Sequence, residues 1–178
     1  MSTFALEIWD DQGTLCTFYT VRKYTGIDAI NAESETDKFF IRFADSGDFE
    51  DEIHLLARLI TENIGNKYGA TDDFFTRFEN KAHALPPKPG SKVEEIKEFG
   101  LDFPLRLFCY RISESIVILF NGGIKNGQTA QESDLSMQFY EAQLFASKIE
   151  EALKDEMIKV SKDGRQLLNY DDSTEIIL

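Results

Sequence analysis

Hydrophobic and polar residues alternate most clearly over residues 103–111, where Leu105, Leu107 and Cys109 fall on every second position. Side chains of a strand point alternately to its two faces, so this period predicts a strand with one fully apolar face. Residues 115–121 contain the continuous apolar run 116–120, which is rich in β-branched side chains, and its length favours a buried strand over a buried helix turn. The short polar link between the two segments predicts that they pair antiparallel.

The stretch 134–154 has the period of a helix instead. Its apolar side chains recur at intervals of three and four positions, at Leu135, Phe139, Ala142, Ala146, Ile149 and Leu153. These intervals place them in one stripe along a helix. We expect this helix to cover one face of the paired strands.

The first 43 residues predict three strands. Aromatic and β-branched residues gather in 4–9 and 15–22, and Asp10-Asp11-Gln12-Gly13 separates the two segments, which indicates a hairpin. Residues 38–43 predict a third strand. The polar and acidic segment 24–37 between them is expected to be a loop.

Two helices and a further strand are expected between residues 49 and 99. Residues 49–64 carry an apolar stripe behind an acidic first turn, which suits the positive end of the helix dipole. Residues 71–84 predict a second helix. Three prolines between 86 and 89 exclude a helix and predict an exposed loop, and 93–99 is expected to be a strand.

The C-terminal residues predict a second hairpin. Segments 157–161 and 165–169 flank the turn-forming Lys162-Asp163-Gly164. The apolar residues 176–178 either dock on the body or a partner, or fray. Together these patterns predict an α+β fold, with an antiparallel sheet packed against helices, in a single domain of residues 1–178.

Charge makes the surface mostly unsuited to nucleic acid. The net charge of the chain is −13. Residues 80–126 are mildly basic, with seven Lys and Arg against five acids, and the remainder carries 12 basic and 27 acidic residues. A basic region of this kind can bind phosphate locally, or it can be solvated surface with no partner.

The cysteines and the N-terminus indicate a cytoplasmic protein. Cys16 and Cys109 lie in apolar, strand-like patterns, which favours buried free thiols over a disulfide or a metal pair. The first residues lack the basic and apolar regions of a signal peptide, and no segment has the roughly 18 apolar residues of a membrane span. We expect no membrane association.

Common catalytic motifs are absent from the sequence: it has no P-loop, dinucleotide fingerprint, zinc-ligand spacing or nucleophile elbow. His54 is expected on a helix surface. His83, beside Lys81 and Lys88, either caps a helix end or takes part in a site. The tripeptide Asn121-Gly122-Gly123 either forms the turn that ends a strand or receives a phosphate on its backbone amides.

The order of helices, Pro/Lys loop, strands LRLFCYRIS and IVILFNGGIK, and final helix resembles the RelE/ParE superfamily of bacterial toxins, in particular its HigB-like branch. The resemblance covers about residues 50–154 and includes Leu105-Arg106, Tyr110-Arg111, the strand 116–120 and the segment 125–129. It implies a RelE-like core, to which this chain adds an N-terminal and a C-terminal hairpin.

The resemblance also implies a function: a toxin-like component of a toxin–antitoxin system and a ribosome-dependent mRNA interferase. Such an endoribonuclease activates a ribose 2′-hydroxyl against the adjacent phosphate and needs a base, a cation and an acid. Carried over to this sequence, Arg106, Tyr110 and Lys125 would be catalytic, with Arg106 on the phosphate and Tyr110 stacking or exchanging a proton. The RNA-binding residues would be Arg111, Lys88 and Lys92.

The implied partners are an antitoxin, expected to be a helix-turn-helix protein, and the ribosome with its mRNA; no cofactor and no metal are implied. This chain departs from the family in its length, its acidity and the lack of a clear catalytic residue at the end of the last strand. The alternative hypothesis is therefore a non-catalytic protein-interaction module on the same fold.

Overall fold

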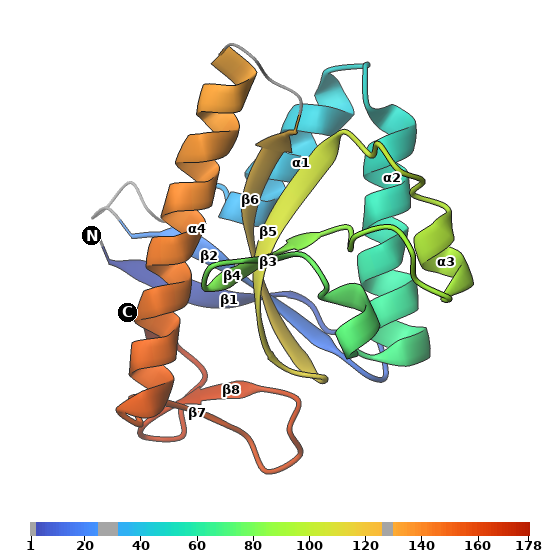
Figure 1. The fold of residues 1–178 in the computed structure, drawn as a ribbon. Coiled ribbons are helices and arrows are strands. Elements are labelled where there is room, and N and C mark those ends of the chain that lie inside the picture. The colour runs from blue at the N-terminus through green and yellow to red at the C-terminus, as the bar shows by residue number, and fades with distance from the viewer. Residues whose placement is uncertain (1–2, 25–31, 126–129) are drawn as a thin grey trace.

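The computed structural model of the protein describes residues 3–24, 32–125 and 130–178. A mixed sheet lies at its centre, with a long helix, α4, on one face and helices α1 and α2 on the other (Figure 1). The elements of the first half are β1 (Phe4–Asp10), β2 (Thr17–Lys23), α1 (Glu35–Asp45), α2 (Glu50–Arg58), the π-helix η2 (Leu59–Tyr68), the 3-10 turn η3 (Asp72–Phe74), β3 (Phe78–Glu79) and β4 (Ala82–Leu85). The second half contains α3 (Glu94–Lys97), β5 (Leu105–Ser113), β6 (Ile116–Ile124), α4 (Ala130–Lys154), β7 (Ile158–Val160), β8 (Leu167–Asn169) and β9 (Ile176–Ile177). The fold is α+β, as predicted.

The predicted central pair is present. β5 and β6 pair antiparallel from Leu105 opposite Ile124 to Ser113 opposite Ile116. The sequence interpretation ended the second strand at Asn121-Gly122-Gly123, which is wrong, because β6 continues through these residues. Gly122 is needed there for a close approach of the two strands: a Cβ on it would lie 1.8 Å from the carbonyl oxygen of Arg106.

The main sheet has the strand order β3-β4-β5-β6-β2-β1-β9. β1 and β2 pair antiparallel, as predicted. The expectation of a purely antiparallel sheet is wrong, because β2 runs parallel to β6, with Thr17 opposite Ile116. The chain leaves β2, passes through α1 and α2, and returns through β5 before it reaches β6, which lets β2 and β6 point the same way.

The strand expected at 38–43 is wrong, because these residues belong to α1. Ser34 caps this helix by accepting a hydrogen bond from the amide of Asp37. Phe39 and Phe43, one helical turn apart, are both buried. Of the loop expected at 24–37, residues 25–31 lie outside the described residues, and residues 35–37 are helical.

The helix expected at 49–64 is confirmed and runs further, through α2 and η2 to Tyr68. Gly65 does not end it. Gly65 instead faces Gly13 in the turn of the first hairpin, where a Cβ on Gly13 would lie 2.2 Å from the Gly65 carbonyl oxygen. The amides of Leu15 and Cys16 donate to that oxygen at 2.9 and 3.1 Å, so the turn and the helix end are joined through the backbone.

Two other expected elements are wrong. Residues 71–84 were expected to be helical, but they form η3 and the short strands β3 and β4, because β5 has an edge for β4 to cover and His83 pairs with Cys109 there. Residues 93–99 were expected to be a strand. They form the single helical turn α3 instead, so that Ile96 within it and Phe99 just after it are buried together.

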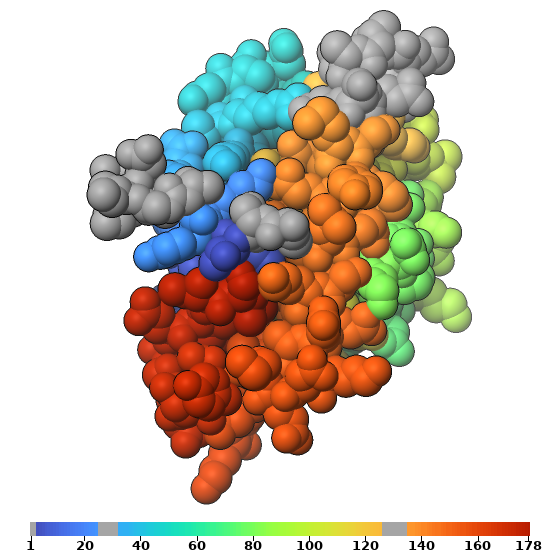
Figure 2. All heavy atoms as spheres, turned by 90° about the vertical axis from the view of Figure 1, so that its left-hand side faces the viewer, coloured from blue at the N-terminus to red at the C-terminus, as the bar shows by residue number. Residues whose placement is uncertain are grey.

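The long helix predicted at 134–154 is confirmed and begins earlier, at Ala130. Its stripe of Ala142, Ala146 and Ile149 is buried against the sheet. β7 and β8 pair antiparallel, as predicted, in a separate two-stranded sheet. The last residues dock rather than fray, since β9 pairs with β1, and Figure 2 shows the C-terminal residues in red against the first strand in dark blue and α4 in orange.

Both cysteines are buried free thiols, as predicted. Burial raises the pKa of the Cys16 thiol to about 12 and raises the pKa of Cys109 as well. Within the described ranges, no helix combines the length and the apolar character that a bilayer crossing requires.

Candidate functional site

The candidate site is a pocket of about 280 Å³ on the α4 face of the sheet. Strands β3 to β5, the residue after β6 and the first described turns of α4 contribute its walls. The lining residues are Arg77, Glu79, Ala84, Arg106, Phe108, Lys125, Leu135, Ser136 and Phe139. The pocket therefore gathers three basic side chains and one acidic side chain over an aromatic and apolar floor.

Arg106 is the most buried charged residue of this site and is only 5% exposed. Its Nη1 donates to the carbonyl oxygens of Phe103 and Leu105, each at 2.8 Å. Burial, and after it the positive charge of Arg77, lower the pKa of Arg106 to about 10, although the carboxylate of Glu79 acts in the opposite direction. Two guanidinium groups thus lie close enough to repel each other in a poorly hydrated place.

Arg77 approaches from the segment before β3. Its Nε donates to the carbonyl oxygen of Pro86 at 3.1 Å. Burial lowers the pKa of Arg77, and the carboxylate of Glu79 partly offsets this. Among the residues that the structure describes, no carboxylate forms an ion pair with Arg77 or Arg106. The pair of arginines is therefore short of negative charge, which an incoming anion would supply.

Lys125 stands at the rim of the pocket. Its backbone amide donates to the carbonyl oxygen of Pro104 at 2.7 Å, which fixes the residue just beyond β6. Its side chain is exposed. The following residues of the segment that carries the family resemblance, 126–129, lie outside the described residues.

The structure brings together two of the three expected catalytic residues, Arg106 and Lys125. Tyr110 shares the strand face of Arg106, as the period of two predicts, but it does not line the pocket. Burial raises the pKa of Tyr110, and the nearby Glu150 raises it while Lys81 lowers it. The Tyr110 phenol therefore lies outside the pocket, near the ion pair that Lys81 forms with Glu150.

The expected RNA-binding residues lie elsewhere. Arg111 is on the opposite sheet face, where it donates to the Ala70 carbonyl oxygen at 2.8 Å and pairs with Asp72 at 2.7 Å. Its guanidinium carbon lies 5.1 Å from the ring centre of Phe75. Lys88 and Lys92 are exposed on the proline-containing loop between β4 and α3 and do not line the pocket.

Arg77 and Glu79 were missed because residues 71–84 were interpreted as a helix. The signal was present in the sequence, since the two charged residues alternate with Phe78 and so share a strand face. Within a helix they would have been on different sides, and no site would follow from them.

The two histidines have different surroundings. His54 is exposed on α2, as predicted. His83 does not end a helix; it lies on β4, and its ring centre is 4.9 Å from that of Phe78 and 5.5 Å from that of Phe75. Burial lowers the pKa of His83, with Arg111 adding to the effect, so its imidazole is neutral at pH 7.

No grouping of three or more metal-binding side chains occurs among the described residues. No family model, curated protein or solved structure matches the chain.

Proposed function

We propose that this protein is a toxin-like RNA-directed protein, an mRNA interferase that acts at the pocket of Arg77, Arg106 and Lys125. The observation that carries the proposal is the buried Arg106 beside the half-buried Arg77, neither with an ion-pair partner among the described residues, together with Lys125 at the rim. A phosphate is the anion that such a cluster of guanidinium and ammonium groups fits best. The site lies within the part of the chain that resembles the RelE/ParE toxins.

The arrangement of elements supports the same proposal. Helices α1 and α2 precede an antiparallel run of β4, β5 and β6, and α4 then covers the face that holds the pocket. Within residues 50–154, on which the resemblance to the HigB-like branch rests, the helix through α2, the strands β5 and β6 and the helix α4 agree with that order, while the second helix expected at 71–84 is replaced by η3, β3 and β4.

The chemistry can be assigned to residues of this pocket. The carboxylate of Glu79 accepts the proton of a ribose 2′-hydroxyl, whose oxygen attacks the adjacent phosphorus while the bond to the 5′-oxygen breaks. The arginines stabilise the negative charge that develops on the phosphate oxygens. The ammonium group of Lys125 gives a proton to the departing 5′-oxygen, so the products are a 2′,3′-cyclic phosphate and a free 5′-hydroxyl.

The local charge limits how RNA can bind. Outside residues 80–126 the chain carries 12 basic and 27 acidic residues, which repel a polyanion. Screening confines this repulsion to a Debye length of about 8–10 Å. A single strand entering the pocket by one or two phosphates is compatible with this surface, and a long duplex lying across it is not.

The test is expression in a bacterial host, followed by mapping of transcript ends on ribosomes. Growth arrest with cut transcripts, relieved in Lys125→Ala and in Glu79→Gln, is expected. Lys162→Ala is the matched control, because Lys162 is exposed on the turn of the separate β7–β8 sheet and does not line the pocket. Thermal unfolding of each purified variant separates lost activity from lost folding.

The alternative, a non-catalytic protein-interaction module, is favoured by one observation. Arg111 is held by Asp72, and Tyr110, Lys88 and Lys92 lie outside the pocket, so the expected catalytic and RNA-binding residues do not converge. Expression without growth arrest, with intact transcripts and no binding of a short fluorescent RNA, would replace the interferase proposal with this one.

A further inference from the structure

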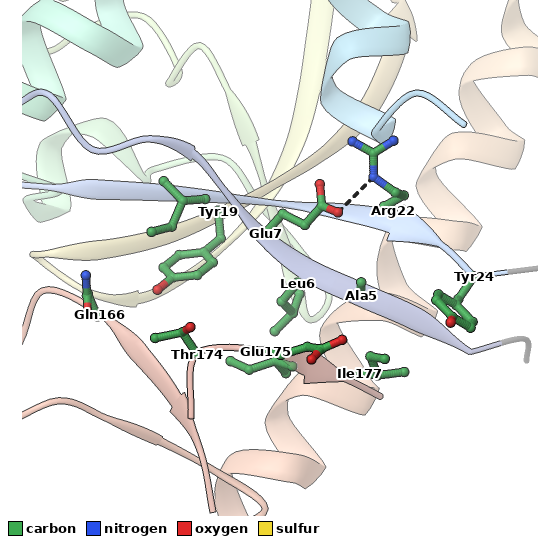
Figure 3. Close-up of a pocket in the computed structure, with 12 residues that line it drawn as sticks. Ala5, Leu6, Glu7, Tyr19, Arg22, Tyr24, Gln166, Thr174, Glu175 and Ile177 are labelled. Atoms are coloured by element: carbon green, nitrogen blue, oxygen red, sulfur yellow. Dashed lines mark hydrogen bonds and ion pairs between the residues drawn. The ribbon is translucent and has the colours of Figure 1, made fainter. Parts of the chain in front are cut away.

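A second pocket, of about 540 Å³, lies at the edge of the main sheet (Figure 3). It forms because β9 is short and pairs with only Ala5 and Leu6 of β1. Beyond Leu6 the C-terminal segment diverges from β1, and the space between Ile8 and Glu175 stays open. It shares no lining residue with the candidate site around Arg77, Arg106 and Lys125, which we call the cationic pocket.

The walls of this edge pocket are apolar and aromatic. Leu6 and Ile176 form its buried floor, and Ile8 is 44% exposed. Tyr19 lies at one end and Tyr24, 46% exposed, at the other (Figure 3). Leu6, Ile8 and Tyr19 share one sheet face, and Ala5 and Ile177 lie on the other with Glu7, where their aliphatic surface suits the methylene stem of a long side chain.

Two carboxylates line the same pocket. Glu7 accepts a hydrogen bond through Oε1 from Arg22 Nε at 2.8 Å, and its second oxygen has no partner among the described residues. Glu175 is exposed, and within the described chain it forms no ion pair. Arg22 pairs with Glu7, and Glu175 has no cationic partner among the described residues, so the pocket carries a negative charge that one more cation would balance.

Polar groups with unused hydrogen-bonding capacity also face this edge. The hydroxyl of Tyr19, 3% exposed, accepts from the Leu167 amide at 2.8 Å, and its own proton has no acceptor among the described residues. Phe4 exchanges two backbone hydrogen bonds with Leu178, at 2.9 and 2.8 Å. By the alternation of an antiparallel pair, the backbone groups of Ile8 point to this edge as well, where β9 no longer reaches.

We propose that the edge pocket binds an arginine side chain carried by an extended segment of a partner protein. The stem of the arginine lies on Ala5 and Ile177, which share the sheet face of Glu7, and its guanidinium reaches Glu175 and the free oxygen of Glu7. The segment continues the line of β9, with its backbone on Ile8 and a carbonyl oxygen on the Tyr19 hydroxyl. The net charge of −13 attracts a basic partner to this surface.

The test uses a fluorescein-labelled pentapeptide, Gly-Val-Arg-Val-Gly, and the same peptide with citrulline in place of arginine. Citrulline keeps the shape of the side chain and removes its charge. Fluorescence anisotropy with the full chain is expected to show binding that is about tenfold weaker for the citrulline peptide, because citrulline cannot form charge-assisted hydrogen bonds with the carboxylates. Glu175→Gln is expected to weaken binding of the arginine peptide.

Glu62→Gln is the matched control, since Glu62 is an exposed glutamate on η2, which covers the opposite face of the sheet. It is expected to bind the arginine peptide as the unchanged protein does. Equal affinity for the two peptides, no binding of either, or an equal loss in both glutamate variants would overturn the proposal. Equal binding of free arginine amide would replace the protein partner by a small molecule. None of these outcomes depends on whether the protein cuts RNA.

Discussion

Single side chains explain why the cationic pocket is unusual. Arg106 holds a positive charge at a site that is 5% exposed, with Arg77 as a neighbour of the same sign. Such burial destabilises a charge unless hydrogen bonds or an opposite charge compensate for it. The two carbonyl oxygens that bind Nη1 compensate in part, and the remaining deficit is what a bound phosphate would remove.

Gly122 controls the approach of β6 to Arg106. We expect Gly122→Ala to lower the free energy of unfolding by about 3 kcal/mol or more, because overpacking costs about 1–3 kcal/mol even where side chains can move aside. Here the added carbon would lie 1.8 Å from a backbone oxygen, which cannot rotate away. Denaturant midpoints measure the change, and an unchanged midpoint would show that the two strands separate freely at this point.

The hydrogen bonds of Glu95 predict that the free energy of unfolding depends on pH. It accepts hydrogen bonds from Lys67 at 2.6 Å and Tyr68 at 2.8 Å, and the bond from Lys67 is the main cause that lowers its pKa from 4.5 to about 2. A carboxyl group with a lower pKa in the folded than in the unfolded state stabilises the fold above the unfolded value. This contribution should be lost as the pH falls from about 4.5 toward 2.

The measurement compares the unfolding midpoints of the unchanged protein and Glu95→Gln. We expect the unchanged protein to be more stable at pH 7 and the difference to shrink near pH 3 (about one unit above the lowered pKa). A difference that stayed constant over this range would show that the contact with Lys67 does not persist in solution.

At the scale of elements, the sequence predicted well where one periodicity dominates. The strands β5 and β6 and the helix α4 carry long, regular patterns, and the structure has all three. The short elements failed because neighbours in space decide them. Phe39 and Phe43 fit a strand pattern in the sequence, but in the structure they lie on a helix that Ser34 caps. Residues 82–85 form the strand β4 because they pair with the edge of β5.

The same failure explains how much of the candidate site could be predicted. Arg106 and Lys125 follow from the central strands, and the structure places both in one pocket. Arg77 and Glu79 alternate about Phe78 in the sequence, but β3 has only two residues, and so short a pattern did not outweigh the helix interpretation of residues 71–84. The separation of Tyr110 from the pocket depends on the direction of α4 across the sheet, which no local pattern encodes.

The buried stripe of α4 gives a test of packing. Ile149→Ala should lower the free energy of unfolding by about 2–5 kcal/mol, because the side chain is fully buried and its removal leaves a cavity. Tyr140→Ala is the control on the same helix, since Tyr140 is 66% exposed, and a change within about 0.5 kcal/mol is expected there. Similar midpoints for both variants would contradict the packing of α4 on the sheet.

At the scale of the whole molecule, charge opposes compactness. A net charge of −13 on 178 residues causes repulsion between acidic surfaces in the folded state. This negative charge affects the two proposed sites differently. It would oppose the binding of phosphate in the cationic pocket, where only the nearby basic side chains attract it, and it would favour the binding of an arginine side chain in the edge pocket. The two sites would attract ligands of opposite charge, so a ligand of one site would not compete for the other.

The net charge predicts a response to salt. Raising the NaCl concentration from about 0.02 M to about 0.5 M should raise the thermal midpoint, because the Debye length falls and the acidic side chains repel one another less. Differential scanning calorimetry measures the shift. A midpoint that falls with added NaCl would mean that the surface ion pairs, such as Lys67 with Glu95, outweigh the repulsion.

The parallel pairing of β2 with β6 has a consequence for how the chain is made. Thr17 is paired with Ile116, so during synthesis β2 leaves the ribosome long before the strand that it must join. Closing so long a loop costs entropy, and such non-local pairing slows folding. Until β6 is synthesised, β2 has only β1 beside it, and its open edge can pair with other nascent chains. The order of synthesis thus makes the interval between these two strands the period in which the protein is most exposed to aggregation.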